Sequence, residues 1–178
     1  MNLKLNPLNL KKNPSIWSSL KRELSKKLNS TIKLIFPEIW DNKYYEWFQN
    51  VENIAFREEL RYSFKEVENR LRNDNLVFLF ILSNNKPEAI LLGYSFPDDN
   101  LKVFFLDTIA IKKYGKGIGI LVLKWFIEWL KKENYEFIRV ETEEMDEKNI
   151  LLYNFYKKLG FKLKERNDKG NLTMILEL

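Results

Sequence analysis

The stretch KVFFLDTIAIKKYGKGIG, residues 102–119, decides the fold predicted for this chain. Its first part is apolar on both faces apart from Asp107, which is typical of a central strand of a sheet. Gly115, Gly117 and Gly119 then form a glycine-rich turn. A long helix is predicted from Gly117 to about residue 134, because its few polar side chains share one narrow face. A strand, a glycine-rich turn and a helix are therefore expected in direct succession.

The segments on either side of this stretch extend it to a mixed α/β domain. Before it, we expect a strand at 31–36, two helices within 41–72, and strands at 76–82 and 89–94 joined by a turn at 84–87. The strand at 102–111 and the helix from 117 follow. After them, we expect a strand at 137–142, a helix at 147–159, and strands at 162–165 and 172–178. This order predicts a central mixed sheet flanked by helices, in one domain that covers residues 31–178.

Residues 1–30 are predicted to form an arm and an amphipathic helix ahead of this domain. Ile16, Leu20, Leu24 and Leu28 recur every four residues, and lysines occupy the opposite face. The pattern favours a helix docked on the domain over a helix that binds a membrane or a partner.

The composition excludes several classes of function. The chain has no Cys and no His, which excludes disulfides, thiolate nucleophiles and zinc sites built on these residues, and no metal is expected. Its net charge of +5 comes from 30 basic and 25 acidic residues, but the lysine pairs are scattered, so no nucleic-acid partner is expected. No segment has the ~20 apolar residues that span a bilayer. We therefore expect a cytoplasmic protein with no membrane partner, as a monomer or a homodimer.

The glycine-rich turn has the chemistry of an anion site. The first N–H groups of a helix have no partner within the helix, and glycines let a phosphate approach the backbone. Lys112, Lys113 and Lys116 supply positive charge beside it. The spacing differs from both the dinucleotide and the Walker patterns. Taken alone, the turn is either an anion cradle or a flexible connection between strand and helix.

A second motif, NILLYNFYKKLGF at residues 149–161, follows thirty residues after Gly119. In a helix, Asn149, Leu152 and Tyr156 fall at i, i+3 and i+7, on one face. Gly160 stands where a helix ends in a left-handed residue. Alone, this pattern also describes an ordinary amphipathic helix with a glycine stop.

Together, the two motifs resemble motifs A and B of the GNAT acetyltransferase superfamily over about residues 31–178. Motif A reads Gln/Arg-x-x-Gly-x-Gly/Ala, and Tyr114 stands at its first position. Motif B reads Asn-x-x-Ala-x-x-x-Tyr-x-x-x-Gly-Phe, and Leu152 replaces its Ala. The resemblance implies an acetyltransferase fold with acetyl-CoA as the cosubstrate. It implies the following cofactor-binding residues: Ile109, Ala110, Ile111, Tyr114, Gly115, Lys116, Gly117, Ile118, Gly119, Asn149, Leu152 and Tyr156.

Acetyl transfer to an amine needs an acid for the leaving thiolate and a base for the amine. A phenol of pKa about 10 can protonate a thiolate of pKa about 8.5, and the resemblance implies that the Tyr156 hydroxyl faces the thioester sulfur. Asp107 is a charge inside an apolar strand, on the face of Ile109 and Ile111, so it must be hydrogen-bonded, paired or functional. Glu141 and Glu143 are the other candidate bases. Without Cys or a Ser–His pair, an acyl-enzyme is disfavoured, and direct transfer in a ternary complex is expected.

The acceptor is open to alternatives. The acidic run 141–147 is either a solvated loop or part of a site for a cationic amine, such as a polyamine, a lysine or an N-terminal amine. Two other classes of function remain: a sensor or interaction module that binds acetyl-CoA without turnover, and a basic nucleic-acid or membrane binder that uses residues 1–28.

Overall fold

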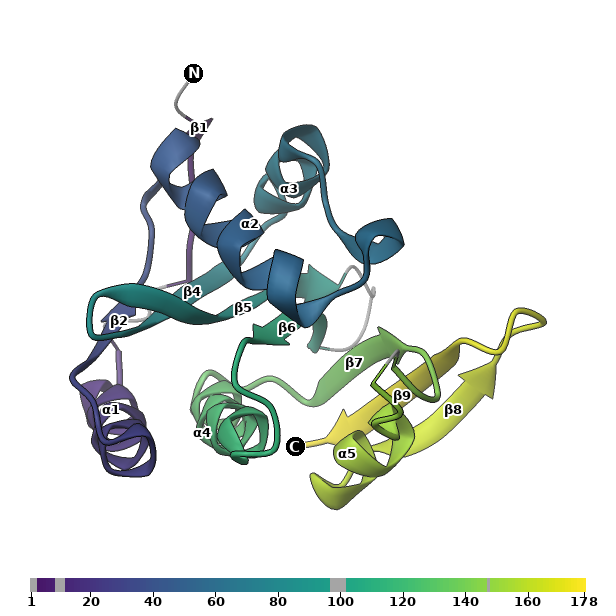
Figure 1. The fold of residues 1–178 in the computed structure, drawn as a ribbon. Coiled ribbons are helices and arrows are strands. Elements are labelled where there is room, and N and C mark those ends of the chain that lie inside the picture. The colour runs from purple at the N-terminus through teal and green to yellow at the C-terminus, as the bar shows by residue number, and fades with distance from the viewer. Residues whose placement is uncertain (1–2, 9–11, 97–101, 147) are drawn as a thin grey trace.

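A computed structural model describes residues 3–8, 12–96, 102–146 and 148–178 of the chain. The described residues form a seven-stranded sheet with helices on both faces (Figure 1). In spatial order, its strands are β2 (Ile32–Ile35), β4 (Val77–Ser83), β5 (Lys86–Phe96), β6 (Val103–Ile111), β7 (Phe137–Thr142), β9 (Leu172–Glu177) and β8 (Lys162–Arg166). Only the pair β6–β7 is parallel among these described strands. The predicted fold class and order of elements are confirmed.

Two layers of helices cover the sheet. One face carries α2 (Asn42–Ala55), the short 3-10 helix η1 (Glu58–Leu60) and α3 (Phe64–Leu71), and the other carries α1 (Pro14–Leu28), α4 (Ile118–Lys132) and α5 (Leu152–Lys158) (Figure 1). Two short strands, β1 (Leu3–Lys4) and β3 (Ile39–Trp40), pair with each other, so part of the expected N-terminal arm is held in a small second sheet. None of the described helices combines the length and apolar character needed to cross a membrane.

The amphipathic helix α1 packs on the domain. Ile16, Trp17, Leu20 and Leu24 are buried in the core that α4 forms with the sheet. The prediction of a docked helix is therefore confirmed, whereas the division of the chain at residue 30 stays a prediction.

A β-bulge at Asp107 changes the predicted face of this residue. Leu92 pairs with Thr108 and Gly93 pairs with Leu106, so Asp107 is the extra residue on β6. The expectation that Asp107 shares a face with Ile109 and Ile111 is wrong. Those two isoleucines pack on the α4 side, while Asp107 contacts residues of the α2–α3 side. The bulge adds one residue, which inverts the alternation of side chains along the strand.

The helix expected at 147–159 begins later in the structure. Its N-cap is Leu151, and Asn149 adopts a left-handed φ of 60° in the loop before it. The Asp146 carboxylate accepts hydrogen bonds from the backbone N–H groups of Lys148 and Ile150. These local bonds give the backbone an alternative to the first helical turn, so the prediction for this turn is wrong. Glu147 lies outside the described residues.

Candidate functional site

The two parallel strands β6 and β7 separate at the centre of the sheet (Figure 1). Their described pairing runs from Val103↔Phe137 to Leu106↔Val140 and then ends. A cavity of about 850 Å³ opens at this point. It is lined by the end of β6, the glycine-rich turn, the end of β7, α5 and the residues that follow α2. The edge of β6 from Asp107 to Ile111 that faces β7 therefore has no described strand partner.

The glycine-rich turn gives the start of α4 its open shape. Gly115 and Gly117 have φ values of 70° and 65°, which L side chains rarely adopt. A Cβ on Gly119 would lie 3.0 Å from Cδ1 of Ile111 and 3.2 Å from the ring of Phe155. The missing side chain at Gly119 thus lets α4, β6 and α5 meet closely beside the cavity.

Two of the three lysines near this turn have polar partners in the structure. The Lys112 ammonium donates to the Asn50 side chain at 2.8 Å, and Lys113 lies 3.5 Å from the Glu88 carboxylate. Lys116 is exposed and forms no ion pair with a described residue. Lys113 nevertheless lines the cavity, and the expectation that the three lysines serve the turn stays a prediction.

Tyr114 connects the glycine-rich turn to the end of α2 by hydrogen bonds. Its hydroxyl donates to the carbonyl oxygens of Ala55 at 2.8 Å and Ile54 at 3.2 Å. The ammonium of Lys148 lies 3.4 Å from the centroid of the Tyr114 ring and donates to the same Ile54 carbonyl. These contacts satisfy the last carbonyls of α2, which have no partner within the helix.

Tyr156 lies on α5 at the inner wall of the cavity. Its side chain is 6% exposed and packs edge-to-face on Phe155 and Phe161. Its hydroxyl has no hydrogen-bond partner among the described residues. Burial raises the pKa of the Tyr156 hydroxyl above its usual value, so the phenol keeps its proton at neutral pH.

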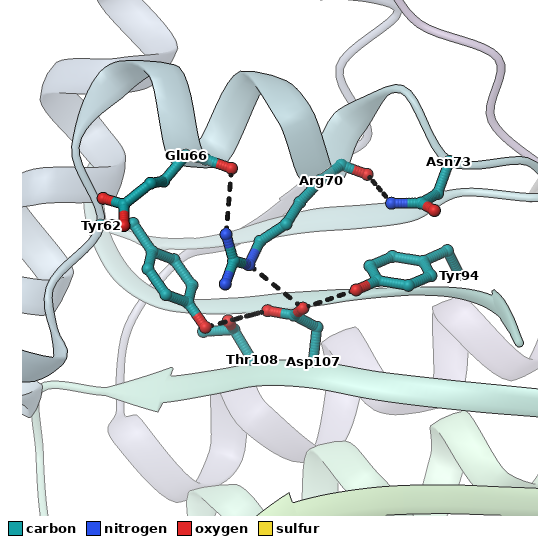
Figure 2. Close-up of polar contacts among 7 residues, drawn as sticks. All are labelled: Tyr62, Glu66, Arg70, Asn73, Tyr94, Asp107 and Thr108. Carbon is teal, nitrogen blue, oxygen red and sulfur yellow. Dashed lines mark hydrogen bonds and ion pairs between the residues drawn. The ribbon is translucent and has the colours of Figure 1, made fainter.

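Asp107 is the centre of a polar cluster on the α2–α3 side (Figure 2). Its Oδ1 accepts hydrogen bonds from the hydroxyls of Tyr62 at 3.3 Å and Thr108 at 2.9 Å. Its Oδ2 accepts from the Tyr94 hydroxyl at 2.8 Å and lies 3.2 Å from Nε of Arg70. A carboxylate inside the sheet is therefore hydrogen-bonded and paired, as its burial demands.

Arg70 and the two tyrosines are themselves held in place. The Arg70 guanidinium reaches down from α3, stacks 3.8 Å from the centroid of the Tyr62 ring and donates to the Glu66 carbonyl (Figure 2). Burial, and then the negative charge of Asp107, raise the pKa values of Tyr62 and Tyr94. Both phenols therefore remain donors to the carboxylate.

A second buried carboxyl, Glu52 on α2, lies behind this cluster. It is 1% exposed and accepts a hydrogen bond from the backbone N–H of Tyr62 at 3.2 Å. Burial is the main reason why the pKa of Glu52 is raised to about 8. At neutral pH Glu52 is therefore mostly protonated, and the cluster holds one carboxylate.

The acidic run that begins at the end of β7 is largely paired with arginines. Glu143 forms a two-armed ion pair with Arg57, with Oε2 2.9 Å from Nη1. The exposed Glu141 carboxylate lies 2.7 Å from Nη2 of Arg139. Glu141 and Glu143 both line the cavity. Of the two side chains, Glu141 is the more exposed, at 54% against 32% for Glu143.

The structure brings most of the predicted site residues to one cavity. The following predicted residues line it: Asp107, Ile109, Ala110, Ile111, Tyr114, Gly115, Gly117, Ile118, Gly119, Glu141, Glu143, Leu152 and Tyr156. Lys116 and Asn149 are exposed and lie outside the lining. Among the described residues no group of three or more acidic side chains could hold a metal ion.

Sequence reasoning missed the partners of Asp107. Tyr62, Arg70 and Tyr94 come from three different elements, and neither periodicity nor a motif links them to Asp107. The available signal was the unpaired charge in an apolar strand, which predicts that donors exist without saying which they are.

Comparison with known families matches residues 38–161 to the sequence model of the acetyltransferase (GNAT) family. No curated protein sequence gives a significant match to the chain.

Solved structures of acetyltransferases share the fold at low sequence identity. The ribosomal-protein-S18-alanine N-acetyltransferase from Escherichia coli is 16% identical, with a TM-score of 0.64 over 83% of this chain and 94% of that one. The aminoglycoside 6'-N-acetyltransferase from Enterococcus faecium is 14% identical, with a TM-score of 0.62 over 82% and 96%. A GNAT family acetyltransferase from Elizabethkingia anophelis, solved with acetyl-CoA bound, is 16% identical, with a TM-score of 0.59 over 83% and 98%.

Proposed function

This chain belongs to the acetyltransferase (GNAT) family, and we propose that it moves the acetyl group of acetyl-CoA onto a primary amine. The observation that carries the proposal is one cavity lined by the start of α4, the end of β6 that has no described strand partner, and Tyr156. The start of α4 would bind a phosphate, the edge of β6 would pair with a pantetheine arm, and Tyr156 would donate a proton at the thioester. This is the order of these groups along acetyl-CoA.

The cofactor would lie along this cavity. The first N–H groups of α4 would bind its pyrophosphate, because they have no helical partner and carry the positive end of the helix dipole. The pantetheine amides would pair with the edge of β6 from Ile109 to Ile111. Leu152 lines the same cavity and would narrow the slot beside the pantetheine arm.

Direct transfer follows from the side chains available. The amine nitrogen attacks the thioester carbonyl carbon, the C–S bond breaks, and the thiolate takes a proton from Tyr156. Tyr156 is the candidate donor because it lines the cavity on α5 and its phenol carries a proton at neutral pH. A β6 backbone N–H would stabilise the oxyanion that develops on the carbonyl.

The proton of the amine would leave through water to a carboxylate. Asp107 is the poorest acceptor of the three candidates, since three hydroxyls and Arg70 occupy its oxygens. Glu143 is held by both arms of Arg57. Glu141 makes one ion pair and lines the cavity, so we propose Glu141 as the proton acceptor.

The acceptor would be a cationic amine: a small diamine or polyamine, a lysine side chain or a protein N-terminus. Carboxylates outnumber cations on the cavity wall, where Asp107, Glu141, Glu143, Asp146 and Glu165 face only Lys113 and Arg139 among the described lining residues. If Glu141→Gln and Glu143→Gln leave the KM for diamines unchanged, this assignment of the acceptor is lost.

The test of the proposed function is coenzyme A release with a panel of amines, for the wild type and Tyr156→Phe. We expect the variant to lower kcat by about 10²–10⁴-fold, the usual contribution of a general acid, with little change in KM for acetyl-CoA. Tyr153→Phe is the matched control, since Tyr153 lies on the same helix outside the cavity lining. Full activity of Tyr156→Phe removes Tyr156 from the mechanism. Binding of acetyl-CoA without thiol release from any amine would instead indicate a sensor.

A further inference from the structure

Helix α1 lies beside α4 (Figure 1), although it precedes the segment that matches the family. Contacts at its two ends show that it runs antiparallel to α4. At one end, the Asn13 amide donates to the Glu133 carboxylate, just after α4, at 3.2 Å. At the other end, the side chain of Lys27 reaches Gly117, the N-cap of α4. Leu20 and Leu24 between these points are fully buried, so the packing fixes the position of Lys27 along α4.

Lys27 covers the residue at which the proposed phosphate site begins. A Cβ on Gly117 would lie 3.3 Å from Cε and 3.4 Å from Nζ of Lys27. The absence of a side chain at Gly117 therefore lets the ammonium approach the backbone of the turn. Lys27 is exposed and forms no ion pair with a described residue.

The charges around this ammonium are those of an anion site. The start of α4 carries the positive end of its helix dipole, and Lys116, next to Gly117, is also exposed and without a described ion-pair partner. The carboxylates of α4 lie toward its other end, where Glu128 pairs with Lys131 and Glu133 accepts from Asn13, and Glu23 lies one turn before Lys27 on α1. The ammonium of Lys27 thus lies beside the N-terminus of α4, where Gly117 lines the cavity, and Lys116 is the neighbouring residue in the chain.

We propose that Lys27 binds a phosphate of acetyl-CoA, so that α1 contributes a cofactor ligand from outside the matched segment. This inference rests on the proposed function, because it takes acetyl-CoA as the ligand of the turn. Helix α1 then has a role in affinity as well as in packing: it holds one positive charge at a fixed place over the pyrophosphate or the 3'-phosphate.

The experiment measures binding of coenzyme A by titration calorimetry for the wild type, Lys27→Met and Lys26→Met. Methionine keeps most of the aliphatic length of lysine and removes the charge. Lys26 is the matched control because it is exposed in the same last turn of α1 and has the same favourable interaction with the C-terminal end of that helix. Any effect of the α1 dipole is therefore common to both variants.

We expect Lys27→Met to weaken coenzyme A binding about three- to fivefold, as for one ion pair at an exposed site, and Lys26→Met to leave it within about 1.5-fold of the wild type. Lys27→Arg should retain most of the affinity. Repeating the titration with 3'-dephospho-coenzyme A identifies the phosphate that Lys27 binds. If Lys27→Met no longer weakens binding of this ligand, Lys27 binds the 3'-phosphate. If the variant still weakens binding, Lys27 binds the pyrophosphate.

Equal affinities of the wild type and Lys27→Met overturn the inference, and so does an equal loss in the Lys26 and Lys27 variants. Neither result affects the proposed function. A wild type that does not bind coenzyme A at all overturns the proposed function itself. A circular-dichroism melt of each variant verifies that α1 remains folded, which is expected because neither lysine is buried.

Discussion

The hydroxyl of Tyr94 donates a 2.8 Å hydrogen bond to the carboxylate of Asp107 on the adjacent strand. Asp107 has no register partner on β5, because the pairing passes from Leu92↔Thr108 to Gly93↔Leu106. The bulge thus turns a carboxylate out of the strand pattern and toward Tyr94, Tyr62 and Arg70 (Figure 2). The Tyr94 bond joins two adjacent strands, and the contacts of Asp107 with Arg70 and Tyr62 join β6 to the α2–α3 layer.

Replacing Asp107 with Asn should destabilise the fold. The variant leaves Arg70 without its carboxylate in a site where the Asp107 side chain is 5% exposed. We expect a loss of about 3 kcal/mol in the free energy of unfolding, the low end of the range for breaking a buried ion pair. Urea unfolding at pH 7, followed by circular dichroism, measures it.

Two further variants provide a comparison for Asp107→Asn. Tyr94→Phe removes one hydrogen bond to Asp107 and should cost about 1–2 kcal/mol. Glu128→Gln breaks the exposed pair with Lys131 on α4 and should change the free energy of unfolding by less than about 0.5 kcal/mol. If Asp107→Asn unfolds at the same urea concentration as the wild type, the cluster is not structural.

The buried carboxyl of Glu52 should make the stability depend on pH. Burial raises its folded-state pKa to about 8 from the usual 4.5, so the folded state holds a proton that the unfolded state has lost. The free energy of unfolding should therefore fall as pH rises from about 4.5 to 8, by at most about 1.4 kcal/mol per pH unit, and level off above pH 8.

Glu52→Gln should remove this dependence of the free energy of unfolding on pH. The amide oxygen can still accept the Tyr62 N–H, and the side chain no longer ionises. In urea unfolding at pH 5, 7 and 9, the free energy of unfolding of the variant relative to the wild type should increase as pH rises. Glu46→Gln, at an exposed position of the same helix, serves as the control and should follow the wild-type curve. Parallel curves for Glu52→Gln and the wild type would contradict the raised pKa.

The order of elements was predictable from local patterns, whereas the contacts at the site were not. Hydrophobic periodicity located β6, α4 and β7, because each of them buries a continuous apolar face. It placed Asp107 on the wrong face, because one extra residue in a bulge leaves no mark in the pattern of polarity. The contact between Lys27 and Gly117 joins residues ninety positions apart through the packing of α1 on α4, and local patterns carry no information on it.

The hydroxyl of Tyr114 should contribute to the shape of the glycine-rich turn. Tyr114→Phe removes its bonds to the Ala55 and Ile54 carbonyls and leaves the ring under Lys148. We expect a loss of about 1 kcal/mol in the free energy of unfolding and a several-fold higher KM for acetyl-CoA, because the turn is less fixed. Tyr45→Phe, which removes an exposed hydroxyl bonded to Gln49, should change neither quantity. An unchanged KM for Tyr114→Phe would show that the anchor is irrelevant to the cofactor.

Asn149 provides a direct comparison between motif and structure. The motif implies a cofactor contact from a helical residue, yet Asn149 is exposed, has a φ of 60° and lies outside the cavity lining. We therefore expect Asn149→Gly, which suits the left-handed backbone, to leave the KM for acetyl-CoA within about twofold of the wild type. Asn149→Ala should lower the free energy of unfolding by about 1 kcal/mol without affecting KM, since alanine disfavours a positive φ. A tenfold rise in KM for both variants, with unchanged stability, would mean that the loop rearranges to bring Asn149 onto the cofactor.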